Sequence, residues 1–332
     1  MRAILSIKPG GPETLELAAV PVPVTGAGQV RIAVKTCAVQ FPDLLIIQDL
    51  YQRKPPRPFT PGSDIAGIVD EVGEGVTGLR EGDRVATGVL TSGGLGEFAV
   101  IGAGRCFKIP DTVSFDTASA LLSYGTSHYA LHSRAQLQAG ETLLVLGAAG
   151  GVGTSAVELG KSMGARVIAA VSSPEKAAFV RARGADDVVI YERGPLDKTA
   201  SKALADRFKA ACGPGGANVI YDGVGGDYAE PALRSIAWEG RYLVVGFPAG
   251  IPKIPLNLPL LKSCQIVGVI YGGAVEREPQ MYCTQMGELF DMYVKGVIKP
   301  TVSERFPLTR AGEAIARLAA REAQGKIIVT ID

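Results

Sequence analysis

The sequence predicts an α/β protein that combines an N-terminal, partly closed all-β unit with a doubly wound parallel sheet. Two observations support this prediction. Up to about residue 120 the chain is dense in Gly and Pro, and short β-branched runs alternate with turn signals. From residue 141 onward, apolar strand-like runs alternate with helical patterns, which is typical of a parallel sheet covered by helices on both faces.

The elements are expected in the following order. The N-terminal strands are "VRIAVKT", "IAGIVDEVG", "DRVAT" and "GEFAVI", and the first helical pattern is "TASALLSYGTSHYALHS". The later strands are "TLLVLG", "ARVIAAV", "DDVVIY", "ANVIYDGV" and "GRYLVVGF". Between the first two of these, Val152, Ala156, Leu159 and Met163 fall on one helix face, and "SPEKAAFVRARG" predicts the next helix. After about residue 265, we expect a helix in "AGEAIARLAAREA" and a last strand in "KIIVTI".

Composition and charge narrow the classes of protein. Hydrophobic residues make up 47% and charged residues 20% of the 332 residues, which suits a globular protein with two domains. The net charge of +1 gives no field that favours nucleic acid or an anionic membrane as the main partner. The first residues do not have the pattern of a secretory signal, and the longest stretch without an ionisable side chain, between Glu141 and Glu158, is shorter than the roughly 20 residues of a spanning helix. We therefore expect a cytoplasmic protein.

The cysteines and histidines do not predict a metal site. The five cysteines lie far apart in the sequence and form no CxxC pair, so each is interpreted as an isolated thiol. The two histidines, His128 and His132, lie four residues apart on a predicted helix, but no nearby carboxylate or thiol completes a ligand set. We interpret them as structural and expect no metal.

The stretch "GAAGGVG", residues 147–153, lies between a predicted strand and a predicted helix. A turn this tight, followed by a helix N-terminus with free N–H groups, is suited to a pyrophosphate. Relative to the usual GxGxxG, Ala148 replaces the first glycine. The expected nucleotide-binding residues are Ala148, Ala149, Gly150, Gly151 and Val152. The alternative is a tight turn that binds nothing.

The end of the next predicted strand indicates which nucleotide is bound. An NAD site has an acidic side chain about 20 residues after the turn, where it holds the ribose 2′-hydroxyl. Here the sequence reads "VSSPEK", which offers Ser172, Ser173 and Lys176 to a 2′-phosphate, although Glu175 works slightly against it. We therefore predict NADPH as the cofactor. The alternative for Lys176 is a solvated surface lysine.

These motifs together resemble the zinc-free quinone oxidoreductase (zeta-crystallin-like) branch of the medium-chain dehydrogenase/reductase superfamily. The matching text is "YQRKPPRPFTPGSDIAGIVDEVGEGVTGLREGDRV", "ETLLVLGAAGGVGTSAVELGKSMGARVIA", "GVIKP" and "GKIIVTI". The resemblance implies a GroES-like β-barrel catalytic domain over residues 1–122 and 266–332, a Rossmann domain over 123–265, and a ligand cleft between them. It also implies a homodimer whose Rossmann sheets pair through a segment matching "CQIVGVIYG".

The resemblance also implies that the zinc ligands are replaced. In zinc-using relatives a cysteine stands at the position of Gln40, and a His-Glu pair stands at Ser63 and Asp64; the four-cysteine structural loop is missing as well. Without a Lewis acid, polarising a simple alcohol or ketone is difficult. Hydride addition to an activated acceptor, a quinone or a double bond conjugated to a carbonyl, is the expected reaction.

Further site residues are implied by the same resemblance. Tyr51 corresponds to a proposed proton donor, and Gln40 stands where an amide contacts the nicotinamide ribose or substrate; the alternatives are a packing aromatic and an amide satisfied by backbone. The expected cofactor contacts are Thr126 near the nicotinamide, Tyr191 beside the 2′-phosphate, Gly246, Phe247, Val269 and Ile270 around the nicotinamide, and Lys326 close to the cofactor. The alternatives are a helix cap for Thr126, strand-end packing for Tyr191 and the four nicotinamide-bordering residues, and a solvated lysine for Lys326.

The expected function is therefore an NADPH-dependent quinone or enone reductase. One alternative is an enoyl-CoA reductase of acryloyl- or crotonyl-CoA type, for which Arg53, Lys54 and Arg57 in "QRKPPRP" would attract the charged CoA; the plainer interpretation is a solvated loop. A second alternative is a non-catalytic NADPH-binding protein with a structural or RNA-binding role. Turnover of a panel of activated acceptors distinguishes these possibilities.

Overall fold

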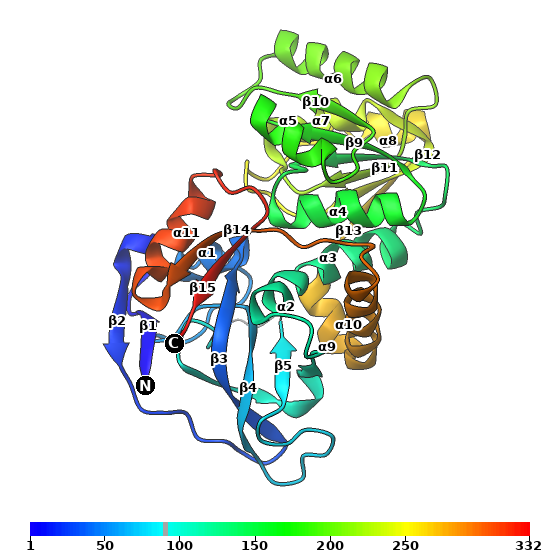
Figure 1. Ribbon diagram of the computed structural model, residues 1–332. Coiled ribbons are helices and arrows are strands. Elements are labelled where there is room, and N and C mark those ends of the chain that lie inside the picture. Colours follow the sequence, from blue (N-terminus) through cyan, green and yellow to red (C-terminus); the bar gives the residue numbers. More distant parts are fainter. Residues whose placement is uncertain (89–91) are drawn as a thin grey trace. The chain divides into compact units, whose positions relative to one another are not determined.

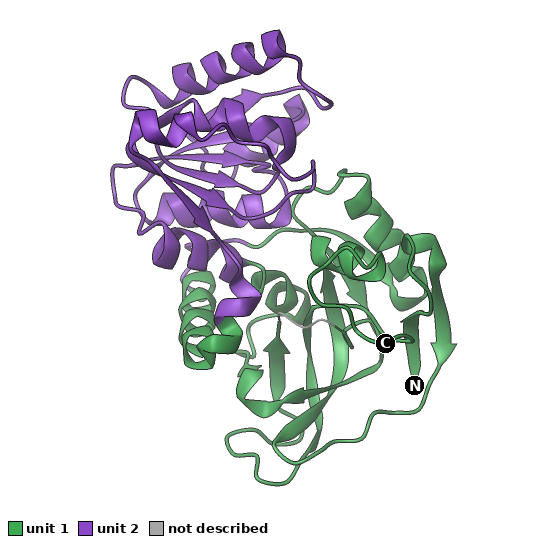
Figure 2. Ribbon diagram, turned by 180° about the vertical axis from the view of Figure 1, so that it is seen from behind, with its two compact units in different colours: residues 1–123, 275–294, 300–332 green, residues 124–274, 295–299 purple. Residues whose placement is uncertain are grey.

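The computed structural model describes residues 1–88 and 92–332, which form two compact units (Figures 1 and 2). Unit 1 comprises Met1–Ser123, Val275–Val294 and Pro300–Asp332, and unit 2 comprises Tyr124–Ala274 and Lys295–Lys299. The boundary expected at residue 266 differs from this division. The strand β13 (Gln265–Gly268) pairs with the parallel sheet of unit 2, and for this reason the chain up to Ala274 clusters with that unit.

Unit 1 is built on a seven-stranded sheet with the order β14-β15-β3-β4-β5-β7, in which β6 also pairs with β3. The strands are β3 (Gln29–Val39), β4 (Asp64–Val72), β5 (Arg84–Thr87), β6 (Phe98–Gly102), β7 (Phe107–Lys108), β14 (Val302–Pro307) and β15 (Lys326–Thr330), with β1 (Arg2–Ser6) and β2 (Leu15–Ala19) as a separate pair. Along β3, Val30, Ile32 and Val34 are buried at every second position, as the period of a strand requires. The four strands predicted in this part of the chain are confirmed.

Helices also belong to unit 1, and the sequence predicted only part of them. They are α1 (Phe41–Ile47), α2 (Phe115–Leu121), α10 (Pro279–Val294) and α11 (Ala311–Ala319). The helix α11 was predicted, whereas α1 and α10 were not. The helix α10 buries Tyr282, Met286, Leu289 and Phe290, which follow the spacing i, i+4, i+7, i+8 of one helix face. This spacing is present in the sequence, although no helix was predicted there.

Unit 2 contains a six-stranded parallel sheet with the order β10-β9-β8-β11-β12-β13. The strands are β8 (Thr142–Leu146), β9 (Arg166–Val171), β10 (Asp187–Ile190), β11 (Ala217–Asp222), β12 (Ile236–Val244) and β13. The helices are α3 (Tyr124–His128), a π-helical turn Tyr129–Arg134, α4 (Gly151–Ser162), α5 (Pro174–Arg181), α6 (Lys198–Cys212), α7 (Ala229–Leu233) and α8 (Asn257–Lys262), while α9 (Tyr271–Arg277) leads into unit 1. The α/β class with a doubly wound parallel sheet is thereby confirmed.

The strand order places the candidate ligand edge of unit 2 beside β8. Leu143, Leu144 and Val145 are 0% exposed, as expected for a central parallel strand covered on both faces (Figure 1). The strand β8 pairs with β9 on one side and with β11 on the other. The chain first adds β9 and β10 on one side of β8 and then continues with β11 on the other side, so the direction in which strands are added reverses at β8. In open α/β sheets a ligand binds outside the carboxyl ends of the strands at such a switch point. The stretch 147–153 begins at this point.

Gly153 is expected to be indispensable for the fold of this turn. A Cβ there would lie 2.2 Å from Gly147 O and 2.8 Å from Ala148 Cα, so Gly153→Ala should lower the free energy of unfolding by about 2–3 kcal/mol. Gly150→Ala is the matched control, because its Cβ would meet Gly147 O at 3.5 Å, an ordinary contact, and should lower it by less than about 1 kcal/mol. Urea unfolding measures both; equal losses would contradict the close-approach explanation.

Candidate functional site

The glycine turn of unit 2 offers backbone groups to a ligand. Gly147 follows β8 with φ of 67°, and α4 begins at Gly151 after Gly150 at its N-cap. Ala148 and Ala149 are 0% and 2% exposed, so neither side chain projects from the turn into the space outside it. The first N–H groups of α4 lack helical partners and lie at the positive end of the helix dipole. The expected residues 148–152 thus form a turn suited to an anion.

The tip of β9 carries the second part of the site. Ser173 caps α5 and accepts a hydrogen bond from the Lys176 backbone N–H at 3.3 Å, while Ser172 Oγ accepts one from Arg193 Nε at 3.2 Å. Because β10 pairs with β9 in parallel, the residues that follow the two strands lie next to each other. Arg193 was missed by the sequence analysis. Its signal was an arginine soon after the third predicted strand.

Tyr191 lies in the interior of unit 2. Its ring is buried and packs against Tyr228, with ring centroids 4.8 Å apart. The Tyr228 hydroxyl lies 3.2 Å from Glu192 O and accepts a hydrogen bond from Gly194 N at 3.0 Å. The two tyrosines therefore hold the segment that carries Arg193. The expected contact of Tyr191 with a 2′-phosphate stays a prediction.

Loops after β11, β12 and β13 form the rest of this edge. Asp222, at the end of β11, accepts hydrogen bonds from Val224 N and Gly225 N at 2.8 Å and from Tyr242 Oη at 2.5 Å, and burial raises the pKa of its carboxyl. These bonds fix the turn that follows β11. The four residues expected near the nicotinamide follow the two neighbouring strands, Gly246 and Phe247 after β12 and Val269 and Ile270 after β13. Phe247 is 41% and Ile270 59% exposed, so both side chains are accessible in unit 2.

Thr126 lies inside α3 and does not cap a helix, so the capping alternative is wrong. The helix α3 packs against α4, the helix that begins at the glycine turn. This contact brings Thr126 into the same part of unit 2 as the turn.

Unit 1 contains a buried polar cluster of Gln40, Asp43, Ser63, Asp64 and Lys326. The strand β3 pairs with β4 and β15 so that Ala38 faces Asp64 and Val39 faces Ile327, which gathers these residues at one place. The Gln40 backbone N–H donates to Asp43 Oδ2 at 2.7 Å, and the Gln40 amide Nε2 donates to the Asp64 carboxylate. Ser63 Oγ donates to Asp43 Oδ1 at 2.5 Å. The Gln40 amide is thus held by a carboxylate, and its side chain also pairs with the Asp43 backbone N–H in a capping box, so both a carboxylate and a backbone partner are present.

Lys326 supplies the positive charge of this cluster. It is 4% exposed, so the alternative of a solvated lysine is wrong. Burial lowers the pKa of its ammonium to about 8, an effect opposed by Asp64 and Asp43. Burial raises the pKa of Asp43 to about 6, while Ser63, the Gln40 N–H and Lys326 act in the other direction. Carboxylates and ammonium therefore stabilise each other in a place where either alone would be strongly unfavourable.

Tyr51 and the basic loop that follows it also lie in unit 1. Tyr51 is partly buried against the core, and this burial raises the pKa of its phenol. Arg53 forms an ion pair with Glu276. Arg57 donates to Asp49 Oδ1 at 2.7 Å and to Ile47 O at 2.9 Å. Arg53 and Arg57 are thus engaged within unit 1.

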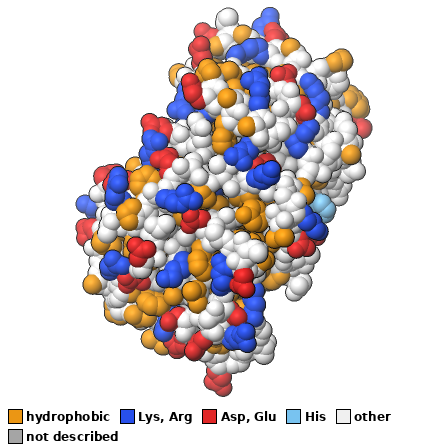
Figure 3. Space-filling view, in the orientation of Figure 1, with side chains coloured by type: hydrophobic (Ala, Val, Ile, Leu, Met, Phe, Trp, Pro, Cys, Tyr) orange, Lys and Arg blue, Asp and Glu red, His pale blue; other side chains and the backbone are white. Residues whose placement is uncertain are grey.

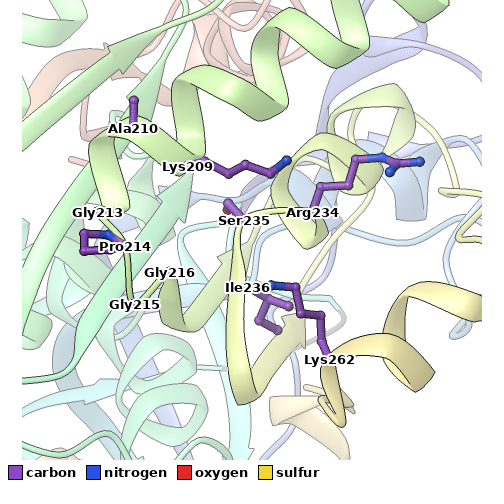
Figure 4. A pocket seen from close by; sticks show the side chains of 10 residues that line it. All are labelled: Lys209, Ala210, Gly213, Pro214, Gly215, Gly216, Arg234, Ser235, Ile236 and Lys262. Atoms are coloured by element: carbon purple, nitrogen blue, oxygen red, sulfur yellow. The ribbon is translucent and has the colours of Figure 1, made fainter.

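A groove of about 520 Å³ in unit 2 is lined by Lys209, Arg234 and Lys262 together with the glycines of 213–216 (Figure 4). It lies before β11 and β12, at the amino ends of the strands and so opposite the glycine turn. Lys209 and Lys262 belong to the last turns of α6 and α8, and Arg234 is the C-cap of α7. Cations there neutralise the negative ends of the helix dipoles. We therefore assign the groove a structural origin and keep the opposite edge as the candidate site.

Within 1–88 and 92–332, no three His, Cys, Asp or Glu side chains lie together in an arrangement that could hold a metal ion. His128 and His132 stack on each other, with ring centroids 5.2 Å apart. The helices among these residues do not combine the length and apolar character needed to span a membrane. On the face drawn in Figure 3, basic and acidic side chains are interspersed.

Comparison with known proteins agrees with the fold and the turn. Residues 26–111 match the alcohol dehydrogenase GroES-like domain, and residues 151–290 match the zinc-binding dehydrogenase family. The chain is 38% identical to a quinone oxidoreductase-like protein 2 homolog of Nematostella vectensis over 92% of this chain and 82% of that protein. It is 30% identical to the quinone oxidoreductase of Homo sapiens over 100% of this chain and 98% of that protein.

Solved structures give the same result. The Escherichia coli quinone oxidoreductase in complex with NADPH superposes with a TM-score of 0.91 at 28% identity, covering 99% of this chain and 100% of that one. A mycobacterial protein in complex with NADPH gives a TM-score of 0.91 at 31% identity, covering 99% of both chains.

The two units and the glycine turn define an oxidoreductase of the dehydrogenase/reductase class, with a GroES-like catalytic domain and a Rossmann domain. Within that class, the chain belongs to the quinone oxidoreductase branch of the medium-chain dehydrogenase/reductase superfamily. The family that the sequence motifs resemble is thereby confirmed.

Replacing Lys326 should have an effect on stability that depends on pH. The pKa of Asp43 is raised from 3.8 to about 6, so the folded protein favours the protonated carboxyl. The contribution of this group to the free energy of unfolding is therefore fully present below pH 3.8 and is lost as the pH rises through about 6. Lys326→Met leaves the ionised carboxylates without their buried cation, so the free energy of unfolding should fall by about 3 kcal/mol at pH 7 and by less at pH 5.

Denaturant unfolding at both pH values measures this difference. Lys202→Met is the control, because it removes the same charge from an exposed position of α6 and should have little effect at either pH. A loss for Lys326→Met that is equal at pH 5 and pH 7 would contradict the proposed pairing.

Proposed function

We propose that this protein is an NADPH-dependent reductase that transfers hydride to a quinone or an α,β-unsaturated carbonyl compound without zinc. The observation that carries the proposal is the pair of Ser172 and Arg193 beside the glycine turn, a guanidinium and a hydroxyl joined at 3.2 Å where a ribose 2′-phosphate belongs. The solved NADPH complexes of two similar proteins support it.

The residues of unit 2 fit this cofactor. The backbone of residues 148–152 would hold the pyrophosphate, because the buried alanines and the glycines allow close approach. Arg193, Ser172 and Lys176 would hold the 2′-phosphate, since a guanidinium binds a phosphate through paired hydrogen bonds. Glu175 is turned toward Ser173, whose hydrogen bond lowers the pKa of that carboxyl. When bound, the nicotinamide supplies the hydride.

The donor set in unit 1 supports a reaction without zinc. A carboxamide, Gln40, and a hydroxyl, Ser63, stand at two positions where the family resemblance aligns zinc ligands, and neither is a usual zinc ligand. Both are already bonded to carboxylates, Gln40 to Asp64 and Ser63 to Asp43. The buried ammonium of Lys326 balances the charge of those carboxylates. With no Lewis acid, the substrate itself has to be electron-poor, as quinones and enones are.

The Tyr51 phenol is the group that would supply the proton of the reaction. Reduction of an enone leaves an enolate, whose carbon needs a proton from a positioned acid. The pKa of Tyr51 is raised by burial, so the phenol keeps its proton at neutral pH and can act as that donor. The two oxygens of a reduced quinone exchange protons with water readily, so this acceptor has less need of Tyr51.

We also propose that the protein is a homodimer. The strand β13 ends the parallel sheet and offers its outer edge for pairing. Ile266 on this strand is 41% exposed, and Leu260 and Leu261 on α8 are 79% and 66% exposed. A second copy pairing through β13 would cover them, as the family resemblance implies.

The charged loop of unit 1 does not favour a CoA ester as the substrate. Arg57 is engaged with Asp49 and Ile47, and Arg53 is paired with Glu276.

The proposal is tested by NADPH oxidation against a panel of quinones, enones and enoyl-CoA esters, with NADH in parallel. Turnover of quinones or enones with a preference for NADPH supports it; tight NADPH binding with no turnover of any acceptor would favour the non-catalytic alternative.

Arg193→Gln is expected to weaken NADPH selectively. Loss of a charge-assisted hydrogen bond to the 2′-phosphate should raise the KM for NADPH by about 10- to 100-fold and leave the KM for NADH almost unchanged. Steady-state kinetics with both cofactors measure the ratio. Arg181→Gln, which removes the same charge from the last turn of α5, is the control. Equal effects on NADPH and NADH would exclude Arg193 from phosphate recognition.

Tyr51→Phe is expected to separate the two classes of acceptor. Without the phenol proton, enone reduction should slow by about 100-fold, the lower end for loss of a positioned acid, while quinone reduction should change by less than about threefold. The kcat values for one enone and one quinone at saturating NADPH provide the test. If both activities remain at the wild-type level, Tyr51 is not the proton donor.

A further inference from the structure

Ser127 lies at the centre of a buried hydroxyl cluster in unit 2. It is 0% exposed, and its Oγ lies 2.8 Å from Val152 O, 2.8 Å from Ser155 Oγ and 2.9 Å from Tyr221 Oη. Ser155 and Tyr221 are also 0% exposed. No sequence pattern predicts this cluster, because its members come from three separate segments.

The number of protons fixes the direction of the bonds. A carbonyl oxygen only accepts, so Ser127 donates its single proton to Val152 O. Tyr221 then donates to Ser127, and burial raises the pKa of the Tyr221 phenol, which keeps that proton in place. Ser155 also lies 2.8 Å from Val152 O and can donate there or to Ser127. All three hydroxyl groups are therefore satisfied, which makes the cluster rigid.

The cluster joins the three segments that matter for the cofactor. Ser127 follows Thr126 on α3, and Val152 belongs to the first turn of α4 at the glycine turn. Tyr221 precedes Asp222, whose carboxylate fixes the loop after β11. Removing the Ser127 hydroxyl would leave the buried Tyr221 phenol without its acceptor and free α3 to shift relative to α4.

We propose that Ser127 is a positioning residue for hydride transfer, which keeps Thr126 in register with the nucleotide turn. This inference rests on the proposed function of the same site. The phosphate groups would be held by the backbone N–H groups of the glycine turn and by Ser172 and Arg193, whereas Ser127 bonds to the Val152 carbonyl oxygen. Ser127 therefore governs where the nicotinamide end lies and has little influence on how tightly the phosphates bind.

A set of variants tests the proposal. Ser127→Ala should slow single-turnover hydride transfer by about 10-fold or more, since small misplacements lower rates strongly, while the Kd for NADPH changes by less than about threefold. Ser127→Cys keeps a weak donor of similar size and should recover part of the rate. Ser235→Ala removes another buried hydroxyl of unit 2, which donates only a local bond of 2.7 Å to Ala232 O, and should leave the rate unchanged.

The double variant S127A/Y221F separates positioning from simple stability. It removes the orphaned phenol hydroxyl, so its thermal midpoint should lie above that of Ser127→Ala, but its hydride-transfer rate should stay low. A rate that returns together with the midpoint would overturn the proposal, and so would a rate within twofold of wild type in Ser127→Ala. Stopped-flow loss of NADPH absorbance and thermal unfolding give the two readouts.

A further measurement keeps this inference distinct from the proposed function. The fluorescence of bound NADPH reports the surroundings of the nicotinamide without any acceptor. A wild-type protein that reduces no acceptor would refute the proposed function, and the fluorescence would still test Ser127. Altered emission in Ser127→Ala and in the double variant would support positioning, and unchanged emission in both would overturn it.

Discussion

The close approach of Gly153 to Gly147 is the contact on which unit 2 depends. A side chain at position 153 would need the space that the Gly147 carbonyl occupies, so helix α4 can begin where it does only because both residues are glycine. The start of α4 determines where its free N–H groups point, and it also presents the Val152 carbonyl to Ser127. One backbone contact thus determines both the geometry of the glycine turn and the place of α3.

Unit 1 depends on a balance of buried charge. Two carboxylates, a carboxamide and a hydroxyl are hydrogen-bonded to one another, and the ammonium of Lys326 interacts with both carboxylates through its charge. A buried carboxylate without a cation would take up a proton or destabilise the fold. Lys326 prevents this, and for that reason it is buried at the first position of β15 instead of lying in solvent.

Local sequence patterns predicted the parts of the molecule that have local causes. Strands β3 to β6 and β15 of unit 1, strands β8 to β12 of unit 2, the glycine turn and the helix with Val152, Ala156 and Leu159 on one face all follow from residue spacing, whereas β7, β13 and β14 were not predicted. Arg193 was missed because its place depends on the pairing of β9 with β10 and on the packing of Tyr191 against Tyr228. The burial of Lys326 and the Ser127 cluster likewise depend on distant strands and helices, which spacing does not report. The helix α1 was missed because seven residues are too few to show a period.

In the proposed function, the choice of cofactor would be made by two neighbouring strands together. The strand β9 contributes the hydroxyl of Ser172 and the helix start with Lys176, while the chain after β10 contributes the guanidinium of Arg193. Neither strand alone distinguishes a ribose 2′-phosphate from a 2′-hydroxyl, because a serine forms hydrogen bonds with both groups. A single lysine at a helix start is common and does not decide between them. A guanidinium held beside that serine changes the preference, since it adds a fixed positive charge with paired donors. The packing of Tyr191 against Tyr228, which holds the Arg193 segment, would therefore contribute to the proposed selection of NADPH even though the Tyr191 ring is buried.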